Sequence, residues 1–259
     1  MSGNVTYKKD GAITTVVIEN EGRLNALSLP MWRQLRQVFQ DLAQDRDETR
    51  CIVLRGAGDA FASGADIAEF EHERYDVKSA RAYGKAIHPA LVAISECPHP
   101  VIAMIHGPCV GGGLEIAGRT DIRICDESAR FGIPVNRLGL VVAYAELKAL
   151  LDIVGPAGAL EMLLEGKIIG AKEALNMRLV NRVVPEARLE REVYETAKRI
   201  SEGAPLAARS HKKFVRRLLE PKPLREDELE ESFDCFDTED FRIGYRAFLD
   251  KEKPKFKGQ

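Results

Sequence analysis

Short apolar runs, each followed by a glycine-containing loop and then a helical segment, constrain the fold of this chain most. Cys51–Leu54 and Val101–Ile105 have the length and apolarity of strands that are buried on both faces. Strand, loop and helix alternate three times before residue 130, and such alternation predicts an α/β fold with a layered core. The predicted strands are Ala12–Glu19, Cys51–Leu54, Val101–Ile105 and Ile122–Cys125, and the predicted helices are Met31–Gln44, Ala80–Ser95 and one that begins at Leu114.

The C-terminal part of the chain has a different character. From about residue 147 the pattern is mainly helical, with a short β-like piece at Leu179–Val184. The last sixty residues are charged and helical, and Pro221-Lys222-Pro223 interrupts them. We therefore predict a core over residues 1–197 and a helical C-terminal oligomerisation region over residues 198–259.

Composition and charge exclude several classes of protein. The 259 residues carry 38 basic and 40 acidic side chains, a formal net charge of −2, which argues against wholesale attraction to nucleic acid or anionic lipid. No apolar run has the length of a membrane span, and the N-terminal residues lack the apolar stretch of a secretory signal. Five cysteines with no CxxC pair and no histidine cluster beside them are typical of reduced thiols. We therefore predict a cytoplasmic protein with no metal and no redox cofactor.

The basic run Arg209–Arg217 admits two interpretations. It has the composition of an RNA-binding patch, and also that of a solvated helix face. Acidic residues follow closely, at Glu220 and Glu226–Glu231. Because these carboxylates offset the basic charge, we expect no nucleic-acid partner.

Two glycine-containing loops are the strongest candidates for a functional site. Ala60–Ile67 follows the first buried strand, and Gly107–Glu115 follows the second and contains three consecutive glycines. Backbone N–H groups at the start of a helix have no partner within the helix, and glycine lets a ligand or another backbone approach closely. Two such loops at the same end of adjacent strands would direct two N–H groups at one oxygen, as in an oxyanion hole. Tight packing without a ligand explains the glycines equally well.

Three segments in the same order resemble the enoyl-CoA hydratase/isomerase (crotonase) family: FASGADIAEF, PVIAMIHGPCVGGGLEIAGRTDIRIC and ARFGIPVNRLGL. Glu165–Ala174, Leu179–Val184 and the C-terminal residues Ala247–Leu249 and Lys253–Phe256 are similar to that family too. The resemblance covers nearly the whole chain. It implies a spiral core of ββα units and a helical C-terminal region that builds homotrimers, often paired as dimers of trimers.

The resemblance also implies a site that binds acyl-CoA thioesters, with CoA as part of the substrate rather than a cofactor. The backbone N–H groups of Ala65 and Gly112 would hold the thioester oxygen, and Glu115 would act as a general acid/base. A raised pKa through burial would suit this carboxyl, whereas an ion pair with Arg119, four residues later, would hold it ionised. The other positions expected to contact substrate or CoA are Leu24, Ala26, Ala62, Ser63, Gly64, Asp66, Ile67, Gly111, Val135, Lys255 and Phe256.

One departure from the family pattern leaves the reaction open. Hydratases of the family carry a second glutamate after the proline of an FGxPE-type motif, and here that position is Val135, followed by Asn136. Tyr144 or Glu146 from the following loop would be the replacement proton donor, although a surface position is equally expected for Glu146. We predict a hydratase-type lyase of acyl-CoA degradation that adds water to a 2-enoyl-CoA. The alternatives are a 3-enoyl-CoA to 2-enoyl-CoA isomerase, a decarboxylase of malonyl-type thioesters, and a non-catalytic CoA- or RNA-binding protein.

A second departure concerns stability. Arg178 occupies a position between a helix and a strand where the family usually has glycine. If the backbone there has a positive φ, arginine costs about 1 kcal/mol relative to glycine.

Overall fold

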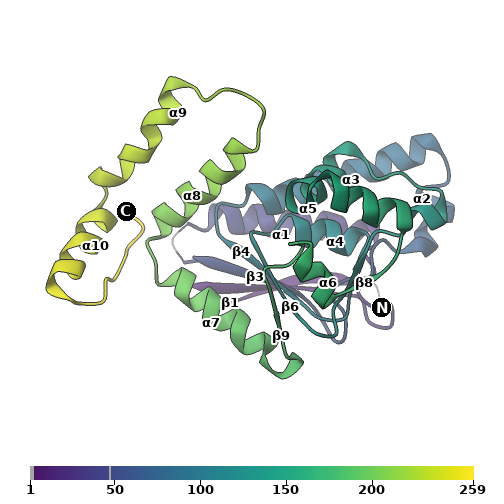
Figure 1. The fold of residues 1–259 in the computed structure, drawn as a ribbon, viewed down its shortest axis with the longest axis horizontal. Coiled ribbons are helices and arrows are strands. Elements are labelled where there is room, and N and C mark those ends of the chain that lie inside the picture. The colour runs from purple at the N-terminus through teal and green to yellow at the C-terminus, as the bar shows by residue number, and fades with distance from the viewer. Residues whose placement is uncertain (1–2, 47) are drawn as a thin grey trace.

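The computed structural model describes residues 3–46 and 48–259, and a six-stranded sheet forms the centre of the molecule (Figure 1). The order of its strands is β1-β2-β3-β4-β6-β9. β1 is antiparallel to β2, and every other neighbouring pair is parallel. The strands are β1 (Asn4–Asp10), β2 (Ile13–Glu19), β3 (Cys51–Gly56), β4 (Val101–Ile105), β6 (Ile122–Asp126) and β9 (Arg182–Val184).

A second, smaller sheet has the order β5-β7-β8, formed by Pro108–Val110, Arg130–Gly132 and Ile169–Gly170. Isolated parallel bridges, Ala62 with Cys109 and Leu27 with Ala65, bring the loop after β3 next to this sheet. The chain therefore passes from a strand of the large sheet to the small sheet and then into a helix, and this ββα unit repeats along the core. This arrangement confirms the predicted α/β spiral core.

Helices cover both faces of the large sheet (Figure 1). Alternate residues of β3 point to opposite faces: Ile52 and Leu54 belong to the main core, whereas Cys51 and Val53 pack with α7. Both faces are covered over Cys51–Leu54 of β3, which is why these four residues form a continuous apolar run; Arg55, near the end of the strand, is only partly buried. The main-core side of the sheet carries α1 (Leu29–Gln44), α3 (Val77–Glu96), α4 (Gly112–Gly118) and α5 (Tyr144–Glu165). The opposite face carries α7 (Leu189–Ser201). The remaining short helical elements before the arm are η1 (Ile67–Glu69), α2 (Phe70–Glu73), η2 (Val135–Leu138), α6 (Ala171–Asn176) and η3 (Glu186–Arg188).

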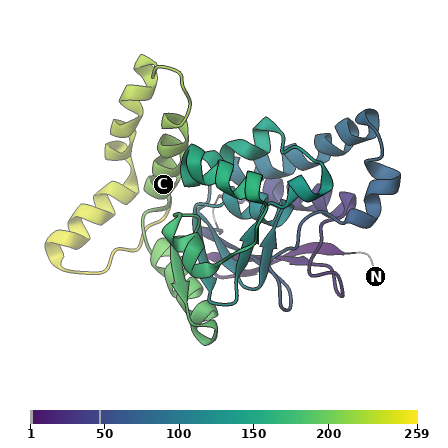
Figure 2. The ribbon, with the colours of Figure 1, turned by 45° about the vertical axis from the view of Figure 1, so that its right-hand side comes forward.

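The last helices form an arm that stands away from the sheet (Figures 1 and 2). The first of them, α8, is tied to the core by Asp121, whose carboxylate forms ion pairs with Lys212 (2.7 Å) and Arg216 (2.9 Å). The outer helices leave large apolar side chains exposed, and Phe248 is 83% exposed. Among the described residues, no helix has the length and apolarity that a membrane crossing needs. The elements of the arm are α8 (Pro205–Leu218), α9 (Glu226–Glu230), η4 (Glu231–Asp237) and α10 (Glu239–Asp250).

The turn between α6 and β9 contains a strained residue. Arg178 has φ 61°, in the left-handed region that favours glycine. Its amide donates to the Leu175 carbonyl oxygen (3.0 Å), and Leu179 immediately after it is fully buried. The sharp turn thus directs Leu179 into the core, at a cost of about 1 kcal/mol relative to glycine.

Candidate active site

The two glycine-containing loops lie side by side. The Val110 amide donates to the Ala62 carbonyl oxygen (3.0 Å), and the Ala62 amide donates to the Pro108 carbonyl oxygen (3.0 Å). Gly113 allows this close approach, because a Cβ at that position would overlap the Ala62 carbonyl group. Glycine is therefore needed here for the contact between the two loops.

The amides of Ala65 and Gly112 are neighbours at this junction. A Cβ built on Gly112 would lie 3.7 Å from Ala65 N, and one built on Gly64 would lie 3.6 Å from Gly112 N. Neither amide donates a hydrogen bond to any acceptor among the described residues. Gly112 is the first residue of α4, where an amide has no partner within the helix. Two adjacent free donors of this kind fit one ligand oxygen.

Both residues line a cavity of about 330 Å³. Its floor comes from the two loops, and its walls come from α3 and from the segment between Pro134 and Glu146. The walls are mostly apolar, which suits an acyl group held next to the two amides. The apolar lining includes Ile67, Phe70, Ile87, Val135, Leu138, Leu140, Val141 and Val142.

Glu115, in the first turn of α4, lines the same cavity. The pKa of its carboxyl is raised to about 7, mainly by burial and also by the negative charge of Glu146, while Arg74 and Arg119 act in the opposite direction. The ion pair with Arg119 that the four-residue spacing permits does not form between these two described side chains. The Arg119 guanidinium instead donates to the Ala145 carbonyl oxygen at the start of α5. Since the Glu115 carboxylate has no ion pair or hydrogen bond within the described chain, it is not held in its ionised form.

Glu146 reaches the same cavity from the start of α5. Its Oε2 accepts a hydrogen bond from the Ala143 amide (3.0 Å), which fixes the carboxylate at the N-terminus of this helix. Tyr144, predicted as an alternative proton donor, is 94% exposed and does not line the cavity. The first turn of α5 directs its side chain into solvent, so the structure favours Glu146 over Tyr144.

Comparison with known proteins decides the family. The sequence profile described as Enoyl-CoA hydratase/isomerase matches residues 8–259. The chain belongs to the enoyl-CoA hydratase/isomerase family. It is 32% identical to the short-chain-enoyl-CoA hydratase of Clostridium acetobutylicum, over 96% of each chain, and 31% identical to the peroxisomal Δ(3,5)-Δ(2,4)-dienoyl-CoA isomerase of Arabidopsis thaliana, over 95% of this chain and 93% of that one.

Solved structures agree with this family and confirm the crotonase fold. The crystal structure of an enoyl-CoA hydratase/carnithine racemase from Magnetospirillum magneticum has a TM-score of 0.97 and 48% identity, covering 98% of this chain and 96% of that one. A structure from Hyphomonas neptunium, described as an enoyl-CoA hydratase/isomerase family protein, has a TM-score of 0.94 and 33% identity, covering 98% of each chain. This hydratase/isomerase-family chain is therefore an enzyme that transforms CoA thioesters.

In this hydratase/isomerase-family enzyme most of the residues predicted for the site come together. Asp66 and Leu24 lie next to the cavity rather than in its lining: Asp66 pairs with Arg23 (2.5 Å), and the Leu24 carbonyl oxygen accepts from the Ser63 amide (3.0 Å). Ala26 and Ala62 are buried and do not line the cavity. The predicted residues that line the cavity are Ser63, Gly64, Ala65, Ile67, Gly111, Gly112, Glu115, Val135 and Glu146.

Two predicted residues do not reach the cavity within one chain. Lys255 and Phe256 lie in the tail after α10, where the Arg50 guanidinium donates to the Phe256 carbonyl oxygen (2.6 Å). Gly244 of α10 lies beside the Phe256 ring. Within one chain, the arm therefore carries the tail away from the cavity.

Arg74 was not predicted as part of the site. Its guanidinium lies 4.6 Å from the centroid of the Phe70 ring and 4.9 Å from that of the Tyr83 ring, and its charge acts on Glu115. In the sequence it belongs to a charged run that is typical of a solvated helix, so no local signal marks it. Asn136 faces away from the site, since its Nδ2 donates to the Leu164 carbonyl oxygen (2.9 Å).

The raised pKa of Glu115 makes stability depend on pH. The pKa of this carboxyl is about 7 in the folded protein and 4.5 in a free side chain. Its contribution to the free energy of unfolding is therefore complete below about pH 4.5 and is lost as pH rises through 7. The free energy of unfolding falls by about 3 kcal/mol over this pH range. We expect Glu115→Gln, which cannot ionise, to equal the wild type in free energy of unfolding near pH 4 and to exceed it near pH 8. Urea unfolding at both pH values measures this, and equal stabilities near pH 8 would contradict it.

Proposed function

We propose that this enzyme hydrates a 2-enoyl-CoA thioester, with Glu115 as its single acid/base. The observation that carries the proposal is the unpaired Glu115 carboxyl in one cavity with the free amides of Ala65 and Gly112. The name of the Clostridium acetobutylicum relative, a short-chain-enoyl-CoA hydratase, supports the same reaction.

In the proposed reaction the two amides donate to the thioester oxygen and stabilise the enolate that forms. The ionised Glu115 takes a proton from water as the water oxygen bonds to the β-carbon. Glu115 then returns that proton to the α-carbon, the enolate becomes a thioester again, and the carboxylate is restored. One carboxylate thus completes the addition, and Val135, where hydratases of the family carry a second glutamate, is a wall of the acyl pocket.

Glu146 serves as a fixed negative charge in this scheme. The Ala143 amide holds its carboxylate at the start of α5, and this charge raises the pKa of Glu115. A general base with a pKa near the working pH combines a useful ionised fraction with enough basicity to remove a proton.

The Glu146→Gln variant tests this role. In the wild type, kcat/KM for hydration should rise as pH increases through about 7, because Glu115 must be ionised. Removing the like charge at position 146 should move this rise to lower pH, while kcat on the high-pH plateau changes by less than about tenfold. Glu190→Gln, an exposed site on α7, is the matched control and should reproduce the wild-type profile. A loss of more than about a hundredfold at every pH would mean that Glu146 itself transfers a proton.

A second candidate reaction is isomerisation of a 3-enoyl-CoA to a 2-enoyl-CoA. Val135 favours it, because a proton shift needs only one carboxylate, and a relative from Arabidopsis thaliana is named a dienoyl-CoA isomerase. Glu115 would remove a proton from the α-carbon and return it to the γ-carbon. Conversion of a 3-enoyl thioester without uptake of water distinguishes this reaction from hydration.

We further propose that the enzyme assembles as a homotrimer or a dimer of trimers through residues 198–259. Exposed apolar side chains on the arm support this, namely Phe233, Phe236, Phe248 and Leu249. Such an assembly would place the Lys255–Phe256 tail of one chain near the cavity of another. Light scattering should give a mass of three or six times 28.8 kDa, and Phe248→Asp should lower it. A wild-type mass of one chain would contradict the proposal.

The proposed setting is acyl-CoA degradation in the cytoplasm, with no metal or redox cofactor. The cysteine usage and the chemistry of Glu115 with two amides support it, since proton transfer and enolate stabilisation need only groups that the chain supplies.

A further inference from the structure

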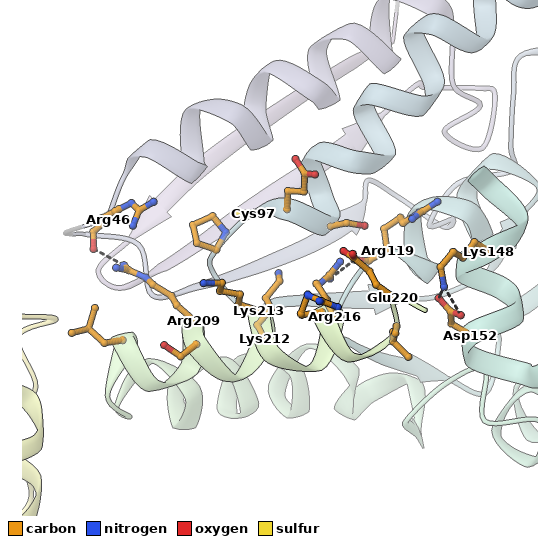
Figure 3. A pocket seen from close by; sticks show the side chains of 17 residues that line it. Arg46, Cys97, Arg119, Lys148, Asp152, Arg209, Lys212, Lys213, Arg216 and Glu220 are labelled. Atoms are coloured by element: carbon orange, nitrogen blue, oxygen red, sulfur yellow. Dashed lines mark hydrogen bonds and ion pairs between the residues drawn. The ribbon is translucent and has the colours of Figure 1, made fainter. Parts of the chain in front are cut away.

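A second and larger cavity, of about 840 Å³, lies between α8 and the neighbouring ends of α3, α4 and α5 (Figure 3). It shares no lining residue with the candidate active site. Figure 3 shows Arg209, Lys212, Lys213 and Arg216 extending from α8 towards the core, with Arg119 and Lys148 on the other side. Cations from separate elements thus face one cavity that is open to solvent.

The lining of this cavity carries a large excess of positive charge. Eight of its side chains are arginine or lysine, and three are carboxylates. Part of the charge is neutralised: Lys148 pairs with Asp152 (2.7 Å), Lys213 with Glu231 (2.6 Å) and Arg217 with Glu228 (2.6 Å). The remaining cations determine the potential inside the cavity.

Among the described residues, four of the remaining cations (Arg46, Arg119, Lys212 and Arg216) form ion pairs with one carboxylate only, that of Asp121. The exposed carboxylates of Glu96 and Glu220 also line the cavity but form no ion pair with them. Lys212 and Arg216 share the single carboxylate of Asp121, although the Lys212 side chain is only 8% exposed. Arg119 forms no ion pair within residues 3–46 and 48–259, and its buried Nε has no hydrogen-bond partner there. The Arg46 guanidinium likewise has no ion pair or hydrogen bond to a described residue. The buried charge of Lys212 and the partly buried charge of Arg119 lack full anionic partners, which is unfavourable, so an anionic ligand would relieve a cost already present at these two residues.

We propose that this cavity binds an anion that carries a diphosphate group. Arginine guanidinium groups donate in pairs to phosphate oxygens, and Arg46, Arg119 and Arg216 lie at separate points along the cavity. A single phosphate would meet only part of this set, whereas a diphosphate has oxygens for several of them. The volume also admits an organic group attached to the phosphates, so inorganic pyrophosphate and a nucleoside diphosphate share the chemistry that the site recognises.

Calorimetric titration of the full-length enzyme tests the proposal, first with pyrophosphate and then with ADP, each at low salt. No CoA is added, because CoA carries a diphosphate of its own and would compete for the same cavity. One ligand per chain should bind. Binding of ADP as tightly as pyrophosphate would identify a nucleotide site, and binding of pyrophosphate alone would identify a site for the inorganic ion.

Three variants locate the binding. Arg46→Gln and Arg216→Gln should each weaken binding at least about tenfold, because each removes a charged donor to phosphate. Arg188→Gln, an exposed position on η3 outside the cavity, makes the same change in net charge and should leave affinity unchanged. If Arg216→Gln fails to fold, Arg46→Gln decides, since its exposed side chain has no partner among the described residues to lose. Absence of binding at millimolar ligand, or equal affinity of wild type and Arg46→Gln, would overturn the proposal.

Discussion

Glu115→Gln should lower kcat for hydration of a 2-enoyl-CoA by about three orders of magnitude. Glutamine keeps the size of the side chain but can neither accept a proton from water nor return one to the α-carbon, and general acid–base catalysis contributes up to about 10⁴-fold. Because Glu115 is the single acid/base in this account, its loss affects both proton transfers. Loss of the enoyl-thioester absorbance measures the effect.

The control for this variant is substrate affinity. The Glu115 carboxyl forms no hydrogen bond or ion pair with the described chain, so the Glu115→Gln substitution should leave the two loops and the affinity for a CoA thioester unchanged. A variant that still binds the thioester and keeps more than a tenth of the wild-type kcat would show that another group does the proton transfer.

Gly113→Ala should have the second-largest effect, through the paired amides. A methyl group at position 113 would overlap the Ala62 carbonyl, and backbone atoms cannot turn away as a flexible side chain does. The two loops must separate, which moves the amides of Ala65 and Gly112 apart. Loss of one such donor costs about 10²–10³ in kcat, so a decrease of that size is expected. Overpacking should also lower the free energy of unfolding by about 1–3 kcal/mol.

Gly170→Ala is the matched control for this substitution. A Cβ at Gly170 meets no atom within 4 Å, and its φ of −88° is accessible to alanine. Its hydration kinetics should equal those of the wild type. Wild-type kcat in a folded Gly113→Ala protein would contradict the assignment of the paired amides to catalysis.

Two of the predicted strands, Cys51–Leu54 in β3 and Val101–Ile105 in β4, are continuous apolar runs. β3 and β4 are buried between two layers of helices, so their local pattern is sufficient to identify them. β5 and β7 were missed because each has three residues, and their pairing partner is distant in the chain. β1 was missed because most of its side chains are polar or exposed, as expected at the edge of a sheet.

Some residues of the candidate site could likewise be predicted from a sequence pattern, and others could not. The local glycine pattern marks the two loops as a candidate site, and the family resemblance then assigns Ala65 and Gly112 within them. Arg74 and the apolar wall other than Ile67 and Val135 come from segments whose own sequence gives no sign of a cavity, because only folding brings them together. The sequence spacing does not predict the partner of Arg119. Four residues along a helix permit an ion pair with Glu115, but the Arg119 guanidinium donates to the Ala145 carbonyl oxygen on α5 instead.

The most direct test of the central claim is hydration of crotonyl-CoA by the wild-type enzyme in water enriched in oxygen-18. The account predicts rapid loss of the enoyl-thioester absorbance and one oxygen-18 atom at the β-carbon of the product, despite valine at position 135. No loss of absorbance and no incorporation, with CoA binding intact, would contradict hydration by a single carboxylate.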